Sequence, residues 1–116
     1  MSQYVLYHNP RCSKSRTTLA LLQEHGVEPE IVLYLDNPPG AAELRELLGK
    51  LGLRADQLVR RGEDAYKERG LDRTSTEDEL VAAMAAEPRL IERPILVCGD
   101  RAVLGRPPEN ALQLLD

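Results

Sequence analysis

The sequence predicts an α/β fold with a mixed four-stranded sheet, flanking helices and a helical insertion. Three observations favour this class. A β-prone run near the start is followed by a helical pattern and a second β-prone run, as in a β-α-β unit. Two further β-prone runs near the end are separated by a two-residue turn signal. Helical patterns occupy the chain between these two halves.

The first half of the chain is predicted to run strand, helix, strand. Residues 4–7 are β-prone, and Asn9-Pro10 marks a turn because proline disfavours helix at the residue before it. From Ser13 the apolar spacing becomes helical, and Gly26 is suited to end that helix. Residues 30–35 are largely apolar, so we expect a buried strand that lies parallel to the first across a right-handed crossover.

The second half is predicted as helices followed by a hairpin. Leucines at helical spacing predict a helix over residues 43–51, and short helical turns broken by Gly62 follow to residue 70. Thr76 and Glu79 form a capping-box pattern for a helix to about residue 86. The remaining elements are a strand over 94–98, the turn Gly99-Asp100, a strand over 102–104 and a short helix over 109–115. This order is the thioredoxin-like plan, and we expect a single domain over residues 1–116.

Composition excludes several classes of function. The chain has 116 residues, of which 42% are apolar and 29% charged, an ordinary globular balance. A net charge of −4 argues against nucleic-acid binding, which needs a basic surface. No apolar run approaches the roughly 20 residues that span a bilayer, so we expect no membrane association. Two cysteines form no disulfide framework, and we therefore expect a cytoplasmic protein with reduced thiols. We also expect a monomer.

Cys12 is the first candidate functional residue. It lies between the end of a strand and the start of a helix, where free N–H groups and the helix dipole stabilise a thiolate. Arg11, Arg16 and His8 are near in sequence, and any of them could add positive potential. The alternative is a buried, inert thiol in a loop; the Asn-Pro turn and the flanking arginines favour the reactive thiol. The same helix start is also an anion site, which suits a tetrahedral oxyanion better than an uncharged disulfide.

The residue at position 15 decides the redox class. A dithiol motif would place a second cysteine there, but the sequence has Ser15. Cys12 therefore lacks a local resolving thiol, and an external thiol should complete each cycle. Cys98 lies in an apolar run, where a cysteine usually behaves as a small hydrophobe, and we expect it to be structural.

Three arginines are candidate anion ligands: Arg60, Arg93 and Arg106. Isolated arginines are usually solvated, and composition alone does not distinguish these three from surface residues. Guanidinium groups nevertheless match oxyanion geometry, and three that converge would hold a dianionic tetrahedral oxyanion. In a thioredoxin-like fold, the proline after Arg93 is expected to be cis and to face the cysteine.

Five segments together resemble the glutaredoxin-coupled arsenate reductase family. They cover nearly the whole chain in one register: residues 7–19, 33–39, 58–61, 92–95 and 104–107. The resemblance implies that Cys12 attacks arsenate, assisted by His8 and Ser15. It also implies that Arg60, Arg93 and Arg106 bind the oxyanion, and we add Arg16 to this set.

The resemblance further implies the electron donors. Glutathione is expected to reduce the thiol-arsenate adduct as a co-substrate, and glutaredoxin to resolve the mixed disulfide and release arsenite. No bound cofactor and no metal are expected, since the sequence has no Cys/His cluster to hold a metal.

Two other functions fit the same scaffold. One is a redox-responsive transcriptional regulator of the Spx type, which shares the fold and binds RNA polymerase. Such regulators typically carry a cysteine pair near the start, and Ser15 argues against that switch. The other is a thiol-redox protein that acts on a different substrate and has no arsenate activity.

Overall fold

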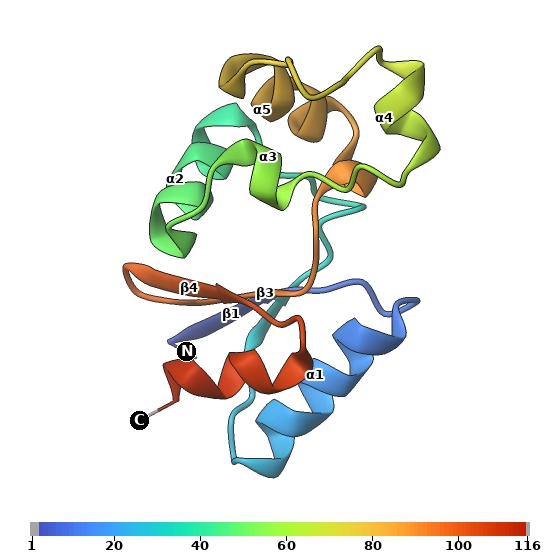
Figure 1. Cartoon of the computed structure of the whole chain (residues 1–116). Helices are drawn as coiled ribbons and strands as arrows, with labels where there is room; N and C mark the ends of the chain where they lie inside the picture. The colour runs from blue at the N-terminus through green and yellow to red at the C-terminus, as the bar shows by residue number, and fades with distance from the viewer. Residues whose placement is uncertain (1–2, 116) are drawn as a thin grey trace. The chain divides into compact units, whose positions relative to one another are not determined.

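The computed structural model describes residues 3–115, which form two compact units (Figure 1). The sheet unit comprises the described residues up to Asn37 together with those from Arg93 onward. The helical unit comprises Pro38–Glu92. The helical insertion predicted from the sequence is therefore a compact unit of its own.

The sheet unit has the mixed four-stranded sheet that the sequence predicts. Its strands lie in the order β2-β1-β3-β4. β1 and β2 are parallel, whereas β1 with β3 and β3 with β4 are antiparallel. The elements are β1 (Tyr4–Tyr7), α1 (Ser13–Glu24), β2 (Glu30–Val32), β3 (Ile95–Cys98), β4 (Arg101–Leu104) and the 3-10 helix η2 (Pro108–Leu114).

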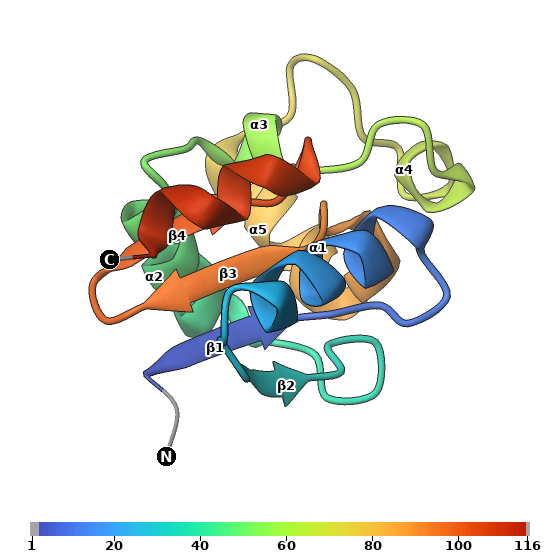
Figure 2. The same cartoon turned by 90° about the horizontal axis from the view of Figure 1, so that it is seen from below.

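Helices α1 and η2 cover one face of this sheet (Figures 1 and 2). A hydrophobic core fills the space between them and the strands, because alternate strand residues point to the same face. Its buried members are Tyr4, Leu6, Leu22, Leu96, Ala111 and Leu114. This core fixes the start of α1 relative to the end of β1 and the start of β3, where the candidate site lies.

The prediction of a buried strand over residues 30–35 is wrong in both the length and the burial of the strand. β2 spans only Glu30–Val32, and residues 33–37 form a turn in which the Leu33 carbonyl accepts from two N–H groups. Ile31, Leu33 and Leu35 are 38–39% exposed, whereas Tyr34 is 2% exposed. The physical reason is that β2 is an edge strand whose only neighbour, β1, ends at Tyr7 opposite Val32.

The last helix is a 3-10 helix rather than an α-helix. Its buried residues Pro108, Ala111 and Leu114 recur at every third position, which matches the three residues per turn of a 3-10 helix. By contrast, α1 ends as predicted. Gly26 has φ +79°, and the N–H groups of Gly26 and Val27 bond back to Gln23 and Leu22.

The helical unit contains short helices, as the sequence predicts. They are α2 (Ala41–Leu51), α3 (Ala55–Leu58), α4 (Asp64–Glu68), α5 (Glu77–Ala86) and the 3-10 helix η1 (Pro88–Leu90). The predicted capping box starts α5: the N–H of Glu79 donates to Thr76 Oγ1 at 3.1 Å, and the N–H of Thr76 donates to Glu79 Oε1 at 2.7 Å. No helix within residues 3–115 has the length and apolar character needed to cross a membrane.

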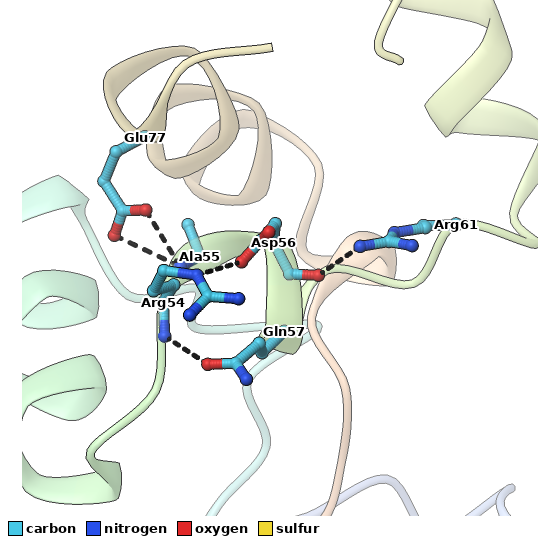
Figure 3. Close-up of polar contacts among 6 residues, drawn as sticks. All are labelled: Arg54, Ala55, Asp56, Gln57, Arg61 and Glu77. Atoms are coloured by element: carbon cyan, nitrogen blue, oxygen red, sulfur yellow. Dashed lines mark hydrogen bonds and ion pairs between the residues drawn. The ribbon is translucent and has the colours of Figure 1, made fainter. Parts of the chain in front are cut away.

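A polar cluster joins α3 to α5 within the helical unit (Figure 3). Both carboxylate oxygens of Glu77 accept from the N–H of Ala55, at 3.0 and 3.1 Å. The side chain of Gln57 accepts from the N–H of Arg54, and Arg61 donates to the carbonyl of Asp56. The contacts of Glu77 and Gln57 satisfy N–H groups at the start of α3 that a four-residue helix cannot satisfy itself, and the Arg61 contact satisfies a carbonyl.

Candidate active site

Cys12 is the N-cap residue of α1, at the place the sequence predicts. β1 ends at Tyr7, and the chain turns through Asn9, whose carbonyl accepts from the N–H of Cys12 at 3.0 Å. The Asn9 side chain accepts from the N–H of Arg11 and supports the same turn. No side-chain cap closes α1, and the N–H groups of Lys14 and Ser15 instead act on the Cys12 sulfur. The sulfur therefore lies at the positive end of the helix.

The environment of Cys12 favours the thiolate. Desolvation raises the pKa of the thiol, but several groups outweigh this effect. These are the N–H of Ser15, the charge and hydrogen bond of the Arg93 guanidinium, and the N–H of Lys14. The pKa of Cys12 consequently lies below its ordinary value of 9.0. A partly exposed thiolate of this kind is a ready nucleophile.

His8 and Ser15 form a buried pair near Cys12. The His8 ring is 6% exposed, and its Nδ1 lies 2.7 Å from the Oγ of fully buried Ser15. The same Oγ accepts from the N–H of Asn9 at 3.1 Å. Burial and then the charge of Arg16 lower the pKa of His8, so the ring is neutral near pH 7. We therefore assign the ring proton to Nε2, with the Ser15 hydroxyl donating to Nδ1.

Two of the predicted anion-binding arginines belong to the sheet unit. Arg93 precedes Pro94 at the start of β3, the Arg93-Pro94 peptide bond is cis as expected, and the guanidinium of Arg93 hydrogen bonds to the Cys12 sulfur. Arg106 follows β4, and its Nη1 donates to the carbonyl of Arg93 at 3.4 Å. The structure thus places Arg93 at the Cys12 sulfur and Arg106 against the Arg93 backbone.

Arg16 and Arg11 do not act on the sulfur in the same way. Nη1 of Arg16 donates to the carbonyl of Pro10 at 3.0 Å, which braces the turn before Cys12. The charge of Arg16 acts on His8. Arg11 is exposed on the turn, which lines one side of a hollow of about 250 Å³.

Arg60 belongs to the helical unit. Its N–H donates to the carbonyl of Leu90 at 2.7 Å, and its guanidinium pairs with Glu63 at 2.7 Å and with Glu92 at 3.6 Å. Arg60, Glu63 and Glu92 line one side of a hollow of about 490 Å³. The two carboxylates offset the charge of Arg60. The sequence analysis did not predict either ion pair, although the three-residue spacing from Arg60 to Glu63 could have indicated the first.

Cys98 lies at the opposite end of the strands from Cys12. In the register of the sheet, Cys98 pairs with Tyr4, whereas Ile95 pairs with Tyr7, the residue from which the chain leads to Cys12. Three strand residues correspond to about 10 Å. Cys98 packs against the core cluster and, like Cys12, is a free thiol. The sheet unit therefore separates Cys12 from the other cysteine of the chain.

Within residues 3–115, no group of three or more His, Cys, Asp or Glu side chains is arranged to hold a metal ion. The chemistry available to the described site is that of a thiol with a lowered pKa, a neutral imidazole and guanidinium groups. Thr18 and Gly105 fall within the motif segments 7–19 and 104–107, but sequence reasoning assigned neither of them a role.

The sheet order and the cysteine with a lowered pKa at the start of the first helix place this protein in the thioredoxin-like class. The family described as ArsC matches residues 7–114, and the chain belongs to this family. The family to which the sequence motifs pointed is thereby confirmed.

Relatives match over nearly their full length. A protein of Escherichia coli K12, named uncharacterized protein YfgD, is 54% identical over 115 residues, which is 97% of each chain. An arsenate reductase of Neisseria meningitidis serogroup A is 46% identical, with 95% of this chain and 96% of the relative covered. The solved structure of an arsenate reductase from Vibrio cholerae superposes with a TM-score of 0.93 at 49% identity and covers 97% of both chains.

Proposed function

We propose that this protein reduces arsenate to arsenite, with Cys12 as the nucleophile and glutathione and glutaredoxin as electron donors. The observation that carries the proposal is the activated sulfur of Cys12, which meets the N–H groups of α1 and the Arg93 guanidinium. Relatives named arsenate reductase at 46% and 49% identity support arsenate as the substrate. The separation of Cys12 from Cys98 supports an external thiol as the reductant.

The first step is attack of the Cys12 thiolate on arsenic. A sulfur–arsenic bond forms, and one arsenic–oxygen bond breaks as its oxygen takes up protons and leaves as water. Arg93 and Arg106 bind the oxyanion and stabilise the charge that moves onto its oxygens. Arg16 adds positive potential near the turn, and the family motif assigns Arg60 to the same anion. In this proposal, Arg60 and Arg93 lie near the leaving oxygen, and Arg106 lies near the product.

His8 and Ser15 assist the nucleophile by holding its surroundings. The Ser15 N–H acts directly on the sulfur, while its hydroxyl bonds to both the His8 ring and the Asn9 N–H. The neutral ring adds no charge of its own. Its contribution is to hold the turn before Cys12 in a fixed position relative to the start of α1. The thiolate then keeps its donors as arsenate enters.

The second step transfers two electrons to arsenic. The sulfur of glutathione attacks the Cys12 sulfur, the sulfur–arsenic bond breaks, and its electron pair reduces As(V) to As(III). Arsenite leaves, and a Cys12–glutathione disulfide remains. Glutaredoxin then attacks this disulfide at the glutathione sulfur, and Cys12 departs as a thiolate. Its lowered pKa makes it a better leaving group than an ordinary cysteine. The reaction needs no bound cofactor, and it fits the reducing cytoplasm, where glutathione is abundant.

The test is arsenate-dependent NADPH oxidation in the presence of glutathione, glutathione reductase and glutaredoxin. Cys12→Ser should abolish turnover, because an alcohol is a far poorer nucleophile than a thiolate. Cys98→Ala is the matched control and should retain most of the activity. Wild-type turnover no higher than that of Cys12→Ser would reject the proposal. Activity on a small mixed disulfide with none on arsenate would instead indicate a thiol reductase with another substrate.

A further inference from the structure

Gly105 makes an unusually close backbone approach in the sheet unit. A Cβ placed on it would lie 2.9 Å from Cγ of Pro94, and 3.0 and 3.2 Å from Oγ1 and Cγ2 of Thr18. The other seven glycines of the chain have nothing within 4 Å of the same position. Gly105 has no positive φ, so the requirement for glycine here comes from space and not from backbone conformation.

Hydrogen bonds hold the three residues in this contact. The N–H of Gly105 donates to the carbonyl of Pro94 at 2.9 Å. Thr18 is fully buried, and its hydroxyl donates to the carbonyl of Lys14 at 2.9 Å, which fixes its rotamer on α1. The hydroxyl also lies 3.5 Å from the carbonyl of Gly105, at the limit of a hydrogen bond. Neither a proline ring nor a buried β-branched side chain can yield easily.

The contact lies between the groups that form the site. Pro94 directly follows Arg93, and Gly105 directly precedes Arg106, whose guanidinium returns to the Arg93 carbonyl. Thr18 lies one turn along α1 from Ser15, and both are fully buried on the same face of the helix that Cys12 caps. The distance between α1 and the Pro94 turn therefore sets the distance between the sulfur and the guanidinium.

We infer that Gly105 and Thr18 are positioning residues, whose close packing against Pro94 holds the Arg93 guanidinium against the Cys12 sulfur. The role of this arrangement in catalysis rests on the proposed function. A methyl group at position 105 would push the Pro94 turn away from α1 by a few tenths of an ångström or more. A charge-assisted hydrogen bond weakens with such a displacement, so the thiolate would lose part of its stabilisation.

The experiment measures the rate of Cys12 alkylation by iodoacetamide as a function of pH, in a Cys98→Ala background so that only one thiol reacts. Gly105→Ala should slow alkylation at neutral pH about fivefold to tenfold and move the midpoint of the profile to higher pH. Gly49→Ala, in the last turn of α2 with open space around it, is the matched control and should alkylate like the parent. Circular dichroism confirms that each variant is folded.

A folded Gly105→Ala variant with the parent alkylation profile would overturn the inference. If that variant does not fold, Thr18→Ala provides the test, because it loosens the contact instead of crowding it. Thr18→Ala should also raise the midpoint, by less, and an unchanged profile would again overturn the inference. Alkylation requires no arsenate. If the parent protein shows no arsenate turnover, the proposed function is rejected. The alkylation profiles would still decide whether Gly105 and Thr18 are positioning residues.

Discussion

Ser15→Ala removes a hydroxyl that serves two buried partners at once. In the native protein, Oγ of Ser15 lies 2.7 Å from Nδ1 of His8 and 3.1 Å from the backbone nitrogen of Asn9. Ser15 is 0% exposed, so water cannot readily replace the lost oxygen. The substitution therefore leaves one buried acceptor and one part-buried donor without their partner.

The magnitude follows from these two losses. The buried His8 acceptor left without a partner costs about 1–3 kcal/mol, and the part-buried Asn9 N–H costs about 1 kcal/mol, so the two together should lower the free energy of unfolding by about 2–4 kcal/mol. For a chain of this size, with an m-value of about 1.5 kcal/mol/M, the urea midpoint should fall by about 2 M. A loss of this size is a large fraction of the total stability of an ordinary domain.

The assay is equilibrium urea unfolding followed by circular dichroism, with Ser13→Ala as the control. Ser13 is exposed at the start of the same helix, and its replacement should change the free energy of unfolding by less than about 0.5 kcal/mol. A Ser15→Ala variant that loses less than about 1 kcal/mol would refute the assigned network, because the His8 and Asn9 groups would then have other partners.

Two further predictions concern charge. Arg93→Gln should raise the pKa of the Cys12 thiol and slow its alkylation at neutral pH about tenfold, since a charge-assisted hydrogen bond to the sulfur is lost; an unchanged pH profile of alkylation would contradict the assigned contact. The native pKa of His8 lies below its ordinary value of 6.5, so the unfolded chain binds the proton more readily. The free energy of unfolding should therefore be greatest above pH 6.5 and should fall as the pH drops from there toward the lower pKa of folded His8. Urea titrations between about pH 7 and pH 5 should show a smaller fall for His8→Gln than for the parent protein.

Local patterns were sufficient to predict most of the elements. The Asn9-Pro10 turn, the Gly26 helix end and the Thr76 capping box each act through neighbours in sequence, and the structure has all three. The strand over residues 30–35 was predicted too long and too buried, because apolar content does not reveal whether a strand has one neighbour or two. The number of neighbours depends on the order of strands, which puts β2 at the edge.

The candidate site divides in the same manner. Sequence alone determined that Cys12 begins a helix and that position 15 offers no second thiol, since both depend only on residues close along the chain. Tertiary structure decided that Arg93 reaches the sulfur, that Cys98 lies at the far end of the strands, and that Gly105 meets Thr18. The two contacts join residues more than eighty positions apart in the sequence, and the place of Cys98 depends on strand register, so only the folded sheet settles all three.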